Sequence, residues 1–348
     1  MASPESRLTI DLDAMAANYA AIRAEGEGVE VAPVVKADGY GLGVGPVGRR
    51  LWTLGARRFF VARASEGVAL RAELVDRNAT IYVLDGAVAG EEPRLRAAGL
   101  IPVLATPEQA ARWDGPAGLH IDTGMNRLGV SPAEAAALVS RRFEIVMSHL
   151  GSAEAQDNAR TTAQLARFRE VRPLFSGIPA SLSASAGAFK GADYRFDFVR
   201  PGISLFGGGP FERTDERIKA VATLDAPILQ IRDLKTGDQV GYGSMFTADR
   251  TMRVAVIGAG YGDGVLRTSH ARGAAALNGV RCPFLAITMD MIVVDIGACP
   301  DASVGDRLEL LGPHATLDDL AAAAGSVAHE ILTGLSRRAI RLYRGAVA

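Results

Sequence analysis

Short apolar runs alternate with longer amphipathic stretches from Val31 to about Arg200, and this alternation most constrains the fold. Strands that alternate with helical stretches are typical of parallel sheets with helices on their faces. Eight βα units predict a closed (β/α)8 barrel of the TIM type, and an open doubly wound sheet is the competing α/β architecture. The candidate strands are residues 31–35, 58–62, 80–84, 100–104, 118–122, 143–148, 179–183 and 197–202.

The pattern changes after about Arg217 to strand-like segments joined by turns, at residues 220–234, 250–260, 274–297 and 306–312. Only residues 316–325 clearly resemble a helix, with Thr316 as the candidate N-cap and Gly325 as the stop signal. We therefore predict a barrel domain over residues 1–217 and a mainly β domain over residues 218–348. The N-terminal strand, within about residues 1–12, is a candidate member of the second domain.

The composition is that of an ordinary globular protein, with 348 residues, 48% of them hydrophobic and 22% charged. A net charge of -1 gives no reason to expect a nucleic acid or an anionic membrane as partner. No apolar run has the roughly 20 residues that span a bilayer, and the N-terminal segment lacks the pattern of a secretion signal. Cys282 and Cys299 form no close-spaced metal motif, so we predict reduced thiols and no metal site. These features favour a cytoplasmic enzyme or binding protein.

Polar residues follow the carboxyl ends of five of the predicted barrel strands. Lys36 follows the first strand, Arg127 the fifth and Ser185 the seventh, while His149 and Arg200 close the sixth and the eighth. In a barrel all five project to the same face, which is where barrel enzymes place their active sites. The sequence therefore predicts a functional site at this face.

Lys36 ends an apolar run and precedes the glycine-rich segment "ADGYGLG". Lys36 has two possible roles. It is either a solvent-exposed lysine at a strand end or a partly desolvated amine that forms an imine with a carbonyl. The glycines of "SASAG" and "RPGIS" let backbone N–H groups approach a phosphate closely. An imine-forming lysine beside a phosphate cup indicates pyridoxal 5'-phosphate as the cofactor. The segment "GAGYGDG" fails as a dinucleotide fingerprint because Asp263 stands where the third glycine is needed.

The sequence resembles the alanine racemase family over essentially the whole chain. The resemblance rests on "VVKADGYGLG", "HIDTGMNRLG", "VRPGISLFG", "VGYGSMFTA", "GYGDG" and "TMDM", in the family's order and spacing. It implies a fold-type III barrel followed by a β domain, and a head-to-tail homodimer in which each active site takes residues from both chains. It also implies interconversion of L-alanine and D-alanine with pyridoxal 5'-phosphate, which supplies or consumes D-alanine for cell-wall metabolism.

The same resemblance assigns roles to individual residues. Lys36 matches the lysine that carries the cofactor and acts as one base, and Tyr242 matches the second base, which comes from the partner chain. Arg127 and Met289 match contacts to the substrate carboxylate, and Tyr261 and Asp290 match the gate to the site. The residues that match the cofactor site are Lys36, Tyr40, Leu84, Arg127, His149, Ser185, Arg200, Gly202 and Ile203.

The chemistry of racemisation explains these residue types. One base must remove the α-proton from one face and another must return a proton to the opposite face. Tyrosine has an ordinary pKa of about 10, so the phenolate of Tyr242 needs nearby cations or hydrogen-bond donors. The resemblance places Arg200 at the pyridine nitrogen. An arginine there cannot accept a proton, which makes the ring a weak electron sink and disfavours transamination.

Two positions depart from the family pattern. His120 stands where many members carry a carbamylated lysine that fixes the arginine matched by Arg127, and we hypothesise that a bound anion replaces the carbamate. His329 stands where a tyrosine usually shapes the pocket for the substrate methyl group. The alternatives are therefore a racemase of wider specificity that accepts serine, or a non-catalytic protein that binds pyridoxal phosphate. A fold-type III decarboxylase fits less well, since its catalytic cysteine is not evident.

Overall fold

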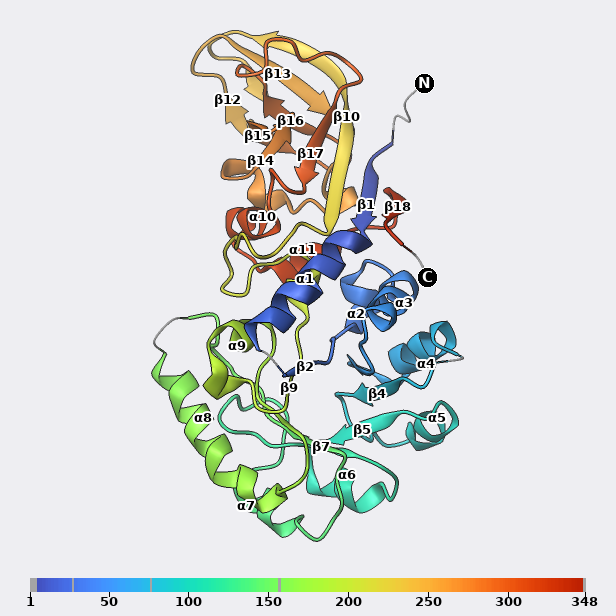
Figure 1. Cartoon of the computed structure of the whole chain (residues 1–348). Helices are drawn as coiled ribbons and strands as arrows, with labels where there is room; N and C mark the ends of the chain where they lie inside the picture. Colours follow the sequence, from blue (N-terminus) through green and yellow to red (C-terminus); the bar gives the residue numbers. More distant parts are fainter. Residues whose placement is uncertain (1–4, 27, 76, 156–157, 347–348) are drawn as a thin grey trace. The chain divides into compact units, whose positions relative to one another are not determined.

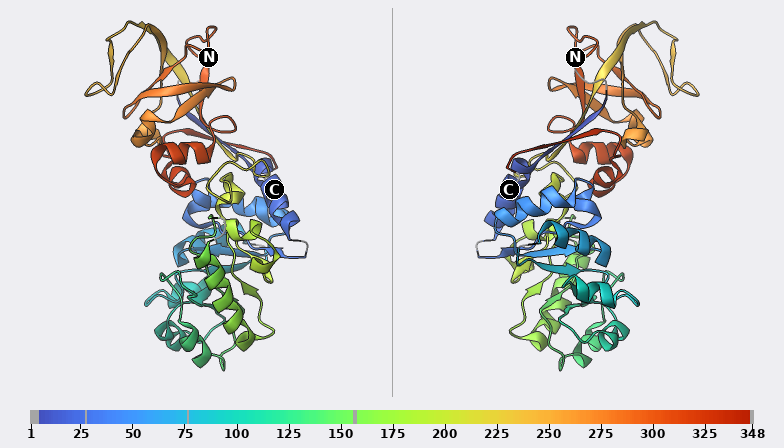
Figure 2. Two further views of the ribbon diagram at one scale, coloured as in Figure 1. Left: turned by 90° about the vertical axis from the view of Figure 1, so that its left-hand side faces the viewer. Right: turned by 90° about the vertical axis from the view of Figure 1, so that its right-hand side faces the viewer.

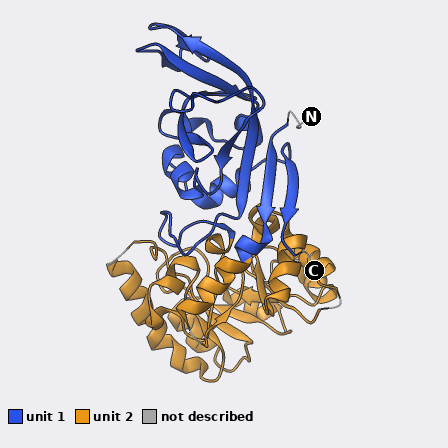
Figure 3. Ribbon diagram, turned by 45° about the horizontal axis from the view of Figure 1, so that its top comes forward, with its two compact units in different colours: residues 1–15, 206–346 blue, residues 16–205, 347–348 orange. Residues whose placement is uncertain are grey.

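The chain divides into two compact units in a computed structural model that describes residues 5–26, 28–75, 77–155 and 158–346 (Figure 3). One unit comprises residues 16–205 of the barrel region. The other comprises residues 206–346 together with the N-terminal residues up to Met15. The chain passes from one unit to the other within helix α1 (Leu12–Glu25).

The first unit contains eight short parallel strands, one for each of the eight predicted strand segments. Six of them form a continuous sheet in the order β3-β4-β5-β6-β7-β8, and β2 pairs with β9 in parallel. The strands are β2 (Glu30–Val31), β3 (Arg58–Val61), β4 (Thr80–Val83), β5 (Ile101–Leu104), β6 (Gly118–His120), β7 (Ile145–Met147), β8 (Ala180–Ser181) and β9 (Phe198–Val199).

Backbone contacts join these two sheets at both edges. Val34, just after β2, forms a parallel bridge with Phe60 of β3. At the other edge, Arg200 N–H donates to the Ser183 carbonyl at 2.9 Å, which links the ends of β9 and β8. The eight strands therefore close into a barrel, and the predicted fold class is confirmed.

Aromatic and aliphatic side chains fill the barrel interior, as is usual for this architecture. The Phe60 ring stacks on Tyr82 with 4.9 Å between the ring centroids and on Phe198 with 6.2 Å. The buried cluster consists of Ala32, Val34, Phe60, Tyr82, Val103, Ile145, Met147 and Phe198. The barrel is thus a packed core, and only its carboxyl end remains for chemistry.

The helices of this unit lie outside the strands (Figures 1 and 2). A capping box begins α7 (Pro132–Ala137), since Ser131 Oγ accepts from Glu134 N–H and the Glu134 carboxylate accepts from Ser131 N–H. Beyond α1, the α-helices are α2 (Lys36–Tyr40), α3 (Val44–Thr53), α4 (Ala64–Glu73), α5 (Glu92–Ala97), α6 (Pro107–Arg112), α7 (Pro132–Ala137), α8 (Ala159–Val171) and α9 (Ser185–Phe189). The 3-10 turns are η1 (Arg172–Phe175), η2 (Ala192–Tyr194) and η3 (Ile203–Phe206).

The second unit is built on an antiparallel barrel with the strand order β13-β16-β15-β14-β17-β10, closed by pairing of β10 with β13. The N-terminal strand β1 pairs antiparallel with β10, and β18 pairs parallel with β1. The strands are β1 (Arg7–Asp11), β10 (Ala222–Leu234), β11 (Gln239–Val240), β12 (Phe246–Thr247), β13 (Met252–Ile257), β14 (Ala274–Leu277), β15 (Val280–Ile287), β16 (Ile292–Asp295), β17 (Arg307–Leu311) and β18 (Ile340–Arg344).

Two helices and two 3-10 turns complete this unit. Helix α10 (Leu317–Ala324) has the predicted limits, because Thr316 Oγ1 accepts from Asp319 N–H and Gly325 adopts the left-handed conformation. The sequence did not predict α11 (Ala328–Gly334) or the 3-10 turns η4 (Tyr261–Asp263) and η5 (Arg267–Ala271). Cys282 and Cys299 are buried free thiols, as predicted. In the part of the chain that the structure describes, no helix combines the length and apolar character needed to cross a bilayer.

Candidate active site

Lys36 lies at the carboxyl end of the barrel, where three strands converge. Val34 N–H donates to the Pro201 carbonyl after β9, and Val35 N–H donates to the Phe60 carbonyl on β3, both at close to ideal length. These bonds fix the backbone immediately before Lys36 against the neighbouring strands. The lysine side chain itself is half-buried.

The chain makes a left-handed helical turn directly after Lys36. Ala37, Asp38, Gly39, Tyr40 and Gly41 all have φ between 52° and 79°. The turn has its own hydrogen bonds, with Gly39 N–H donating to the Val35 carbonyl at 3.0 Å and Gly41 N–H to the Ala37 carbonyl at 2.7 Å. Residues with a Cβ are disfavoured here by about 1–2 kcal/mol each. Such strain persists where the surroundings enforce it, and it gathers at functional sites.

The environment of Lys36 weakens proton binding by its amine. Burial lowers the pKa of Lys36, and the charge of Arg127 lowers it further, while Glu66 and Asp85 act in the opposite direction. A neutral amine is the form that attacks a carbonyl or accepts a proton. Lys36 is therefore suited to both roles that the sequence assigned to it.

A small cup of polar groups lies at the ends of the last two strands. Ser185 Oγ, at the start of α9, accepts from Gly202 N–H at 3.1 Å and from Ser204 N–H at 3.2 Å. The buried Tyr40 hydroxyl approaches Gly202 so closely that a Cβ built there would lie 2.0 Å from Tyr40 Oη. Ser204 Oγ is buried without a hydrogen-bond partner among the described residues. Ile203, between these two residues, is also buried.

Arg200 is a buried cation at the end of β9, with only 2% of its surface exposed. Its guanidinium donates to Ser181 Oγ on β8 and to the Ser148 carbonyl after β7. Burial lowers the pKa of Arg200 to about 9. Both of these hydrogen-bond acceptors are neutral oxygens, so an anionic or electron-rich partner would stabilise the charge.

Two histidines lie close to Arg200 and Arg127. Burial and the charges of these two arginines lower the pKa of His120 to about 3, and they lower the pKa of His149 in the same direction. His120 is buried on β6, and its Nδ1 has no hydrogen-bond partner among the described residues. Both imidazoles are therefore neutral at pH 7. Neither adds a further positive charge to the site.

Arg127 is exposed at the tip of the loop after β6. Asp122 organises this loop, because its carboxylate accepts from the N–H groups of Gly124, Met125 and Asn126. Leu84, which directly follows β4, is half-buried and packs on the barrel core. All the predicted cofactor-site residues lie in this unit, and the structure brings Lys36, Arg127, His149 and Arg200 within electrostatic reach of one another.

The remaining predicted site residues lie in the other unit. Tyr242 sits in the loop between β11 and β12, between Gly241 and Gly243 with positive φ, and 80% of its surface is exposed. Met289 is 52% exposed, and Tyr261 and Asp290 are also exposed. His329 is an exposed residue of α11.

The loops that carry Tyr261 and Met289 are bound to each other. Tyr261 N–H donates to the Thr288 carbonyl at 3.0 Å, and Gly262 N–H donates to the Met289 carbonyl at 2.9 Å. Asp290 accepts from the Arg338 guanidinium at 2.7 Å. These residues therefore form one local surface of the β unit.

The residues of the barrel unit fit pyridoxal 5'-phosphate. The hydroxyls of Tyr40, Ser185 and Ser204 and the Cβ-free position at Gly202 suit a phosphate, and Ser204 Oγ lacks a partner in the described part of the chain. Lys36 offers the amine. Arg200 offers an N–H donor where a carboxylate would accept a proton, which suits a ring nitrogen that stays unprotonated.

The sequence analysis did not identify four residues around this site, which are Ser148, Ser181, Ser204 and Glu66. Ser204 was not singled out, although it follows the matched Gly202 and Ile203 directly. Ser181 and Ser148, which hold Arg200, and Glu66, which contacts the turn after Lys36, were also missed. The only local signal for Glu66 was its place three residues after the start of the "RASEG" segment, where a capping carboxylate is common.

Comparisons with known proteins agree with this geometry. The family profile "Alanine racemase, N-terminal domain" matches residues 10–210, and "Alanine racemase, C-terminal domain" matches residues 221–343. The alanine racemase of Methylobacterium nodulans is 43% identical, with 97% of this chain and 96% of the relative covered. The catabolic alanine racemase of Agrobacterium fabrum is 41% identical, with 97% and 91% covered.

A solved structure extends the likeness to three dimensions. The alanine racemase of Bartonella henselae with covalently bound pyridoxal phosphate superposes with a TM-score of 0.91 at 33% identity, over 98% of this chain and 100% of that chain. Fold and site together define a barrel-type pyridoxal-phosphate enzyme. The chain belongs to the alanine racemase family.

Replacing Gly202 by alanine tests the cup. The new Cβ would collide with Tyr40 Oη, and because Tyr40 is only 4% exposed its ring cannot turn aside. We expect Gly202→Ala to lower cofactor affinity by at least about tenfold, measured as colour retained after dialysis. Gly334→Ala is the matched control, since nothing lies within 4 Å of its Cβ position. If both variants retained the same amount of colour, the assignment of these residues to a phosphate-binding cup would be wrong.

Replacing His120 tests its buried neutral state. Its pKa falls from 6.5 to about 3 on folding, so the unfolded chain takes up the proton first as the pH drops. The contribution of His120 to stability is therefore present above about pH 6.5 and is lost toward pH 3. The unfolding free energy of the wild-type protein should fall as the pH drops from about 7.5 to 4.5. We expect this decrease to be smaller in His120→Asn by about 1–3 kcal/mol, measured in urea titrations. An unchanged slope in His120→Asn would refute the assignment.

Proposed function

We propose that this member of the alanine racemase family interconverts L-alanine and D-alanine with pyridoxal 5'-phosphate attached to Lys36. The observation that carries the proposal is the half-buried Lys36 amine with a lowered pKa, at the same barrel end as the cup of Tyr40, Ser185 and Gly202. When bound, the cofactor supplies an aldehyde that takes up an amine and a ring that withdraws electrons from the α-carbon.

The chain's own residues have four tasks in this proposal. Tyr40, Ser185, Gly202, Ile203 and Ser204 hold the phosphate. Arg200 would hydrogen-bond the ring nitrogen while keeping its own proton, and His149 and Leu84 would contact the cofactor. Arg127 binds the substrate carboxylate. Lys36 Nζ takes or returns the α-proton on one face of the substrate.

The second base must act on the opposite face, because a single base that stays on one face returns the same enantiomer. We assign this role to the phenol of Tyr242 from a second copy of the chain, in a homodimer with shared active sites. The assignment is supported by the exposure of Tyr242, Met289 and Tyr261 in the β unit. Exposed large apolar side chains, here with the loops of Tyr261 and Met289 bound to each other, are typical of a protein interface. The same proposal makes Met289 a contact of the substrate carboxylate and makes Tyr261 and Asp290 the gate.

The physiological role that we propose is supply or consumption of D-alanine for cell-wall metabolism. Incubation of the purified protein with L-alanine, followed by chiral analysis of the product, tests the activity directly. D-alanine should accumulate until both enantiomers are equal. Absence of D-alanine with cofactor bound would overturn the proposal.

The cofactor should be attached to Lys36 and to no other lysine. The remaining lysines of the sequence are Lys190, Lys219 and Lys235, and two of them are engaged by carbonyls, Lys190 by Ala155 and Lys219 by Glu216. We expect Lys36→Ala to abolish the borohydride-reducible link, measured by mass spectrometry of the reduced protein. Lys190→Ala is the control and should keep it. A link that survives in Lys36→Ala would remove Lys36 from the site.

Loss of the Tyr242 hydroxyl should affect turnover and leave cofactor attachment intact. Removal of a positioned acid–base group usually costs 10²–10⁴-fold in rate, so we expect Tyr242→Phe to lose at least about 100-fold. The solvent isotope effects of the two directions should also diverge, because only one direction loses its base. Tyr343→Phe changes another exposed tyrosine of the same unit and should be neutral. Near-full activity in Tyr242→Phe would exclude Tyr242 from the mechanism.

A further inference from the structure

We propose that Glu66 is the positioning residue for Lys36, because its carboxylate holds the left-handed turn from which the lysine projects. The inference rests on the proposed function for the role of Lys36. The contact itself is a feature of the barrel unit alone. Glu66 lies in the first turn of α4, after β3, and it reaches across to the loop that follows β2.

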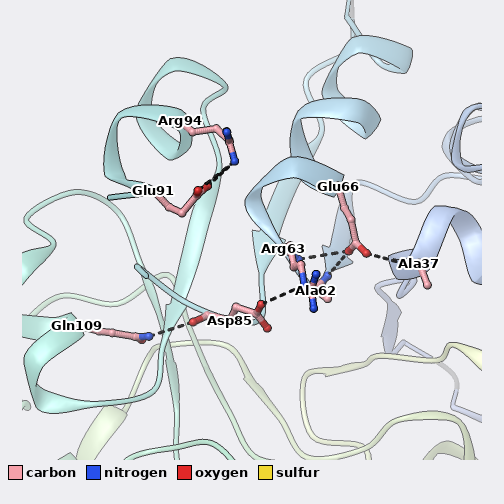
Figure 4. Close-up of polar contacts among 8 residues, drawn as sticks. All are labelled: Ala37, Ala62, Arg63, Glu66, Asp85, Glu91, Arg94 and Gln109. Carbon is pink, nitrogen blue, oxygen red and sulfur yellow. Dashed lines mark hydrogen bonds and ion pairs between the residues drawn. The ribbon is translucent and has the colours of Figure 1, made fainter. Parts of the chain in front are cut away.

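The two oxygens of Glu66 bind two different segments (Figure 4). Oε2 accepts from Ala62 N–H at 2.7 Å and from Arg63 N–H at 3.3 Å, which caps the start of α4 in the usual way. Oε1 accepts from Ala37 N–H at 2.9 Å. An ordinary helix cap has no need of this second contact. The carboxylate therefore joins the strand ends of β2 and β3 at the position of Lys36.

The contact to Ala37 N–H serves a group that the turn itself leaves unpaired. The N–H groups of Gly39, Gly41 and Gly43 bind carbonyls of the turn or of the residues just before it. Ala37 is the first left-handed residue, at φ 52°, and its N–H donates to the Glu66 carboxylate. A hydrogen bond to a charged acceptor is about twice as strong as a neutral one. Glu66 thus offsets part of the strain where the turn begins.

Glu66 also belongs to the charge environment of the amine. Glu66 and Asp85 both raise the pKa of Lys36, against burial and Arg127. Arg63 lies between these carboxylates, with its Nε 3.9 Å from Asp85 Oδ2 (Figure 4). Asp85 shares the electrostatic effect on Lys36, whereas Glu66 also accepts a hydrogen bond from the turn. This difference separates the positioning effect from the charge effect.

The chain supplies matched controls for both effects. Asp85→Asn removes a carboxylate near Lys36 without touching the turn. Glu134→Ala removes a capping-box glutamate from α7, at the same place in its helix as Glu66 in α4, and far from the turn in sequence. Glu66→Asp keeps the charge and can still cap α4, but its shorter side chain cannot bridge both segments.

The experiment compares hydrogen exchange and amine labelling in the full-length chain, with and without added pyridoxal 5'-phosphate. We expect Glu66→Ala and Glu66→Asp to speed exchange of the segment from Ala37 to Gly43 by about tenfold, with no change in Asp85→Asn or Glu134→Ala. The pH profile for labelling of Lys36 by an amine reagent should move to lower pH in Glu66→Ala and Asp85→Asn and stay in place in Glu66→Asp. In steady-state assays Glu66→Asp should lower kcat with little change in KM.

Two results would overturn the inference. One is wild-type exchange at Ala37 to Gly43 in Glu66→Asp, and the other is equal loosening in Glu134→Ala. These outcomes are independent of the proposed function, which is tested by the Lys36→Ala variant. If Lys36→Ala lost the cofactor link while Glu66→Asp kept a protected turn, only the role of Glu66 would be wrong.

Discussion

The candidate site depends on a strained backbone turn held at the end of a rigid barrel. Three of its five left-handed residues, Ala37, Asp38 and Tyr40, carry a Cβ, so the local sequence disfavours the turn. Contacts from other segments enforce it, including Glu66 on Ala37 and the close approach of Tyr40 to Gly202. The same approach that enforces the turn also forms the cup. The position of the Lys36 amine and the shape of the polar cup therefore both depend on the contact between Tyr40 and Gly202.

The charge distribution around this turn follows a second constraint. Arg200 is buried on neutral oxygens, and two histidines beside it stay neutral because another positive charge there would be costly. Burial and the charge of Arg127 also lower the pKa of Lys36. The hydrogen bonds of Arg200 go to neutral oxygens, which leaves its charge available to an anionic or electron-rich ligand. In the proposed function, a phosphate and a substrate carboxylate would supply negative charge at this end of the barrel.

Much of the fold could be predicted because its signals are local. The eight apolar runs, the cap of α7 at Ser131 and the ends of α10 at Thr316 and Gly325 each depend on neighbouring residues. The placement of Lys36 and Arg200 at one barrel face followed from a rule about strand ends. The left-handed turn and its contact with Glu66 could not be predicted, because Glu66 lies 29 residues from Ala37. Ser204 was missed because a serine two residues after Gly202 has no distinctive sequence pattern.

The division of the candidate residues between two units has a chemical consequence. The barrel unit has the amine and the arginines, but the phenol proposed as second base is on an exposed loop of the β unit. A phenol in water ordinarily titrates near pH 10, so as a base at neutral pH it needs nearby cations or hydrogen-bond donors that stabilise the phenolate. Arg127 is such a cation, exposed at the tip of its loop. If the Tyr242 loop of one chain packed against the barrel of a second chain, Arg127 would stabilise the phenolate and the phenolate would neutralise Arg127. Assembly of two chains is therefore a condition for catalysis in the proposed mechanism.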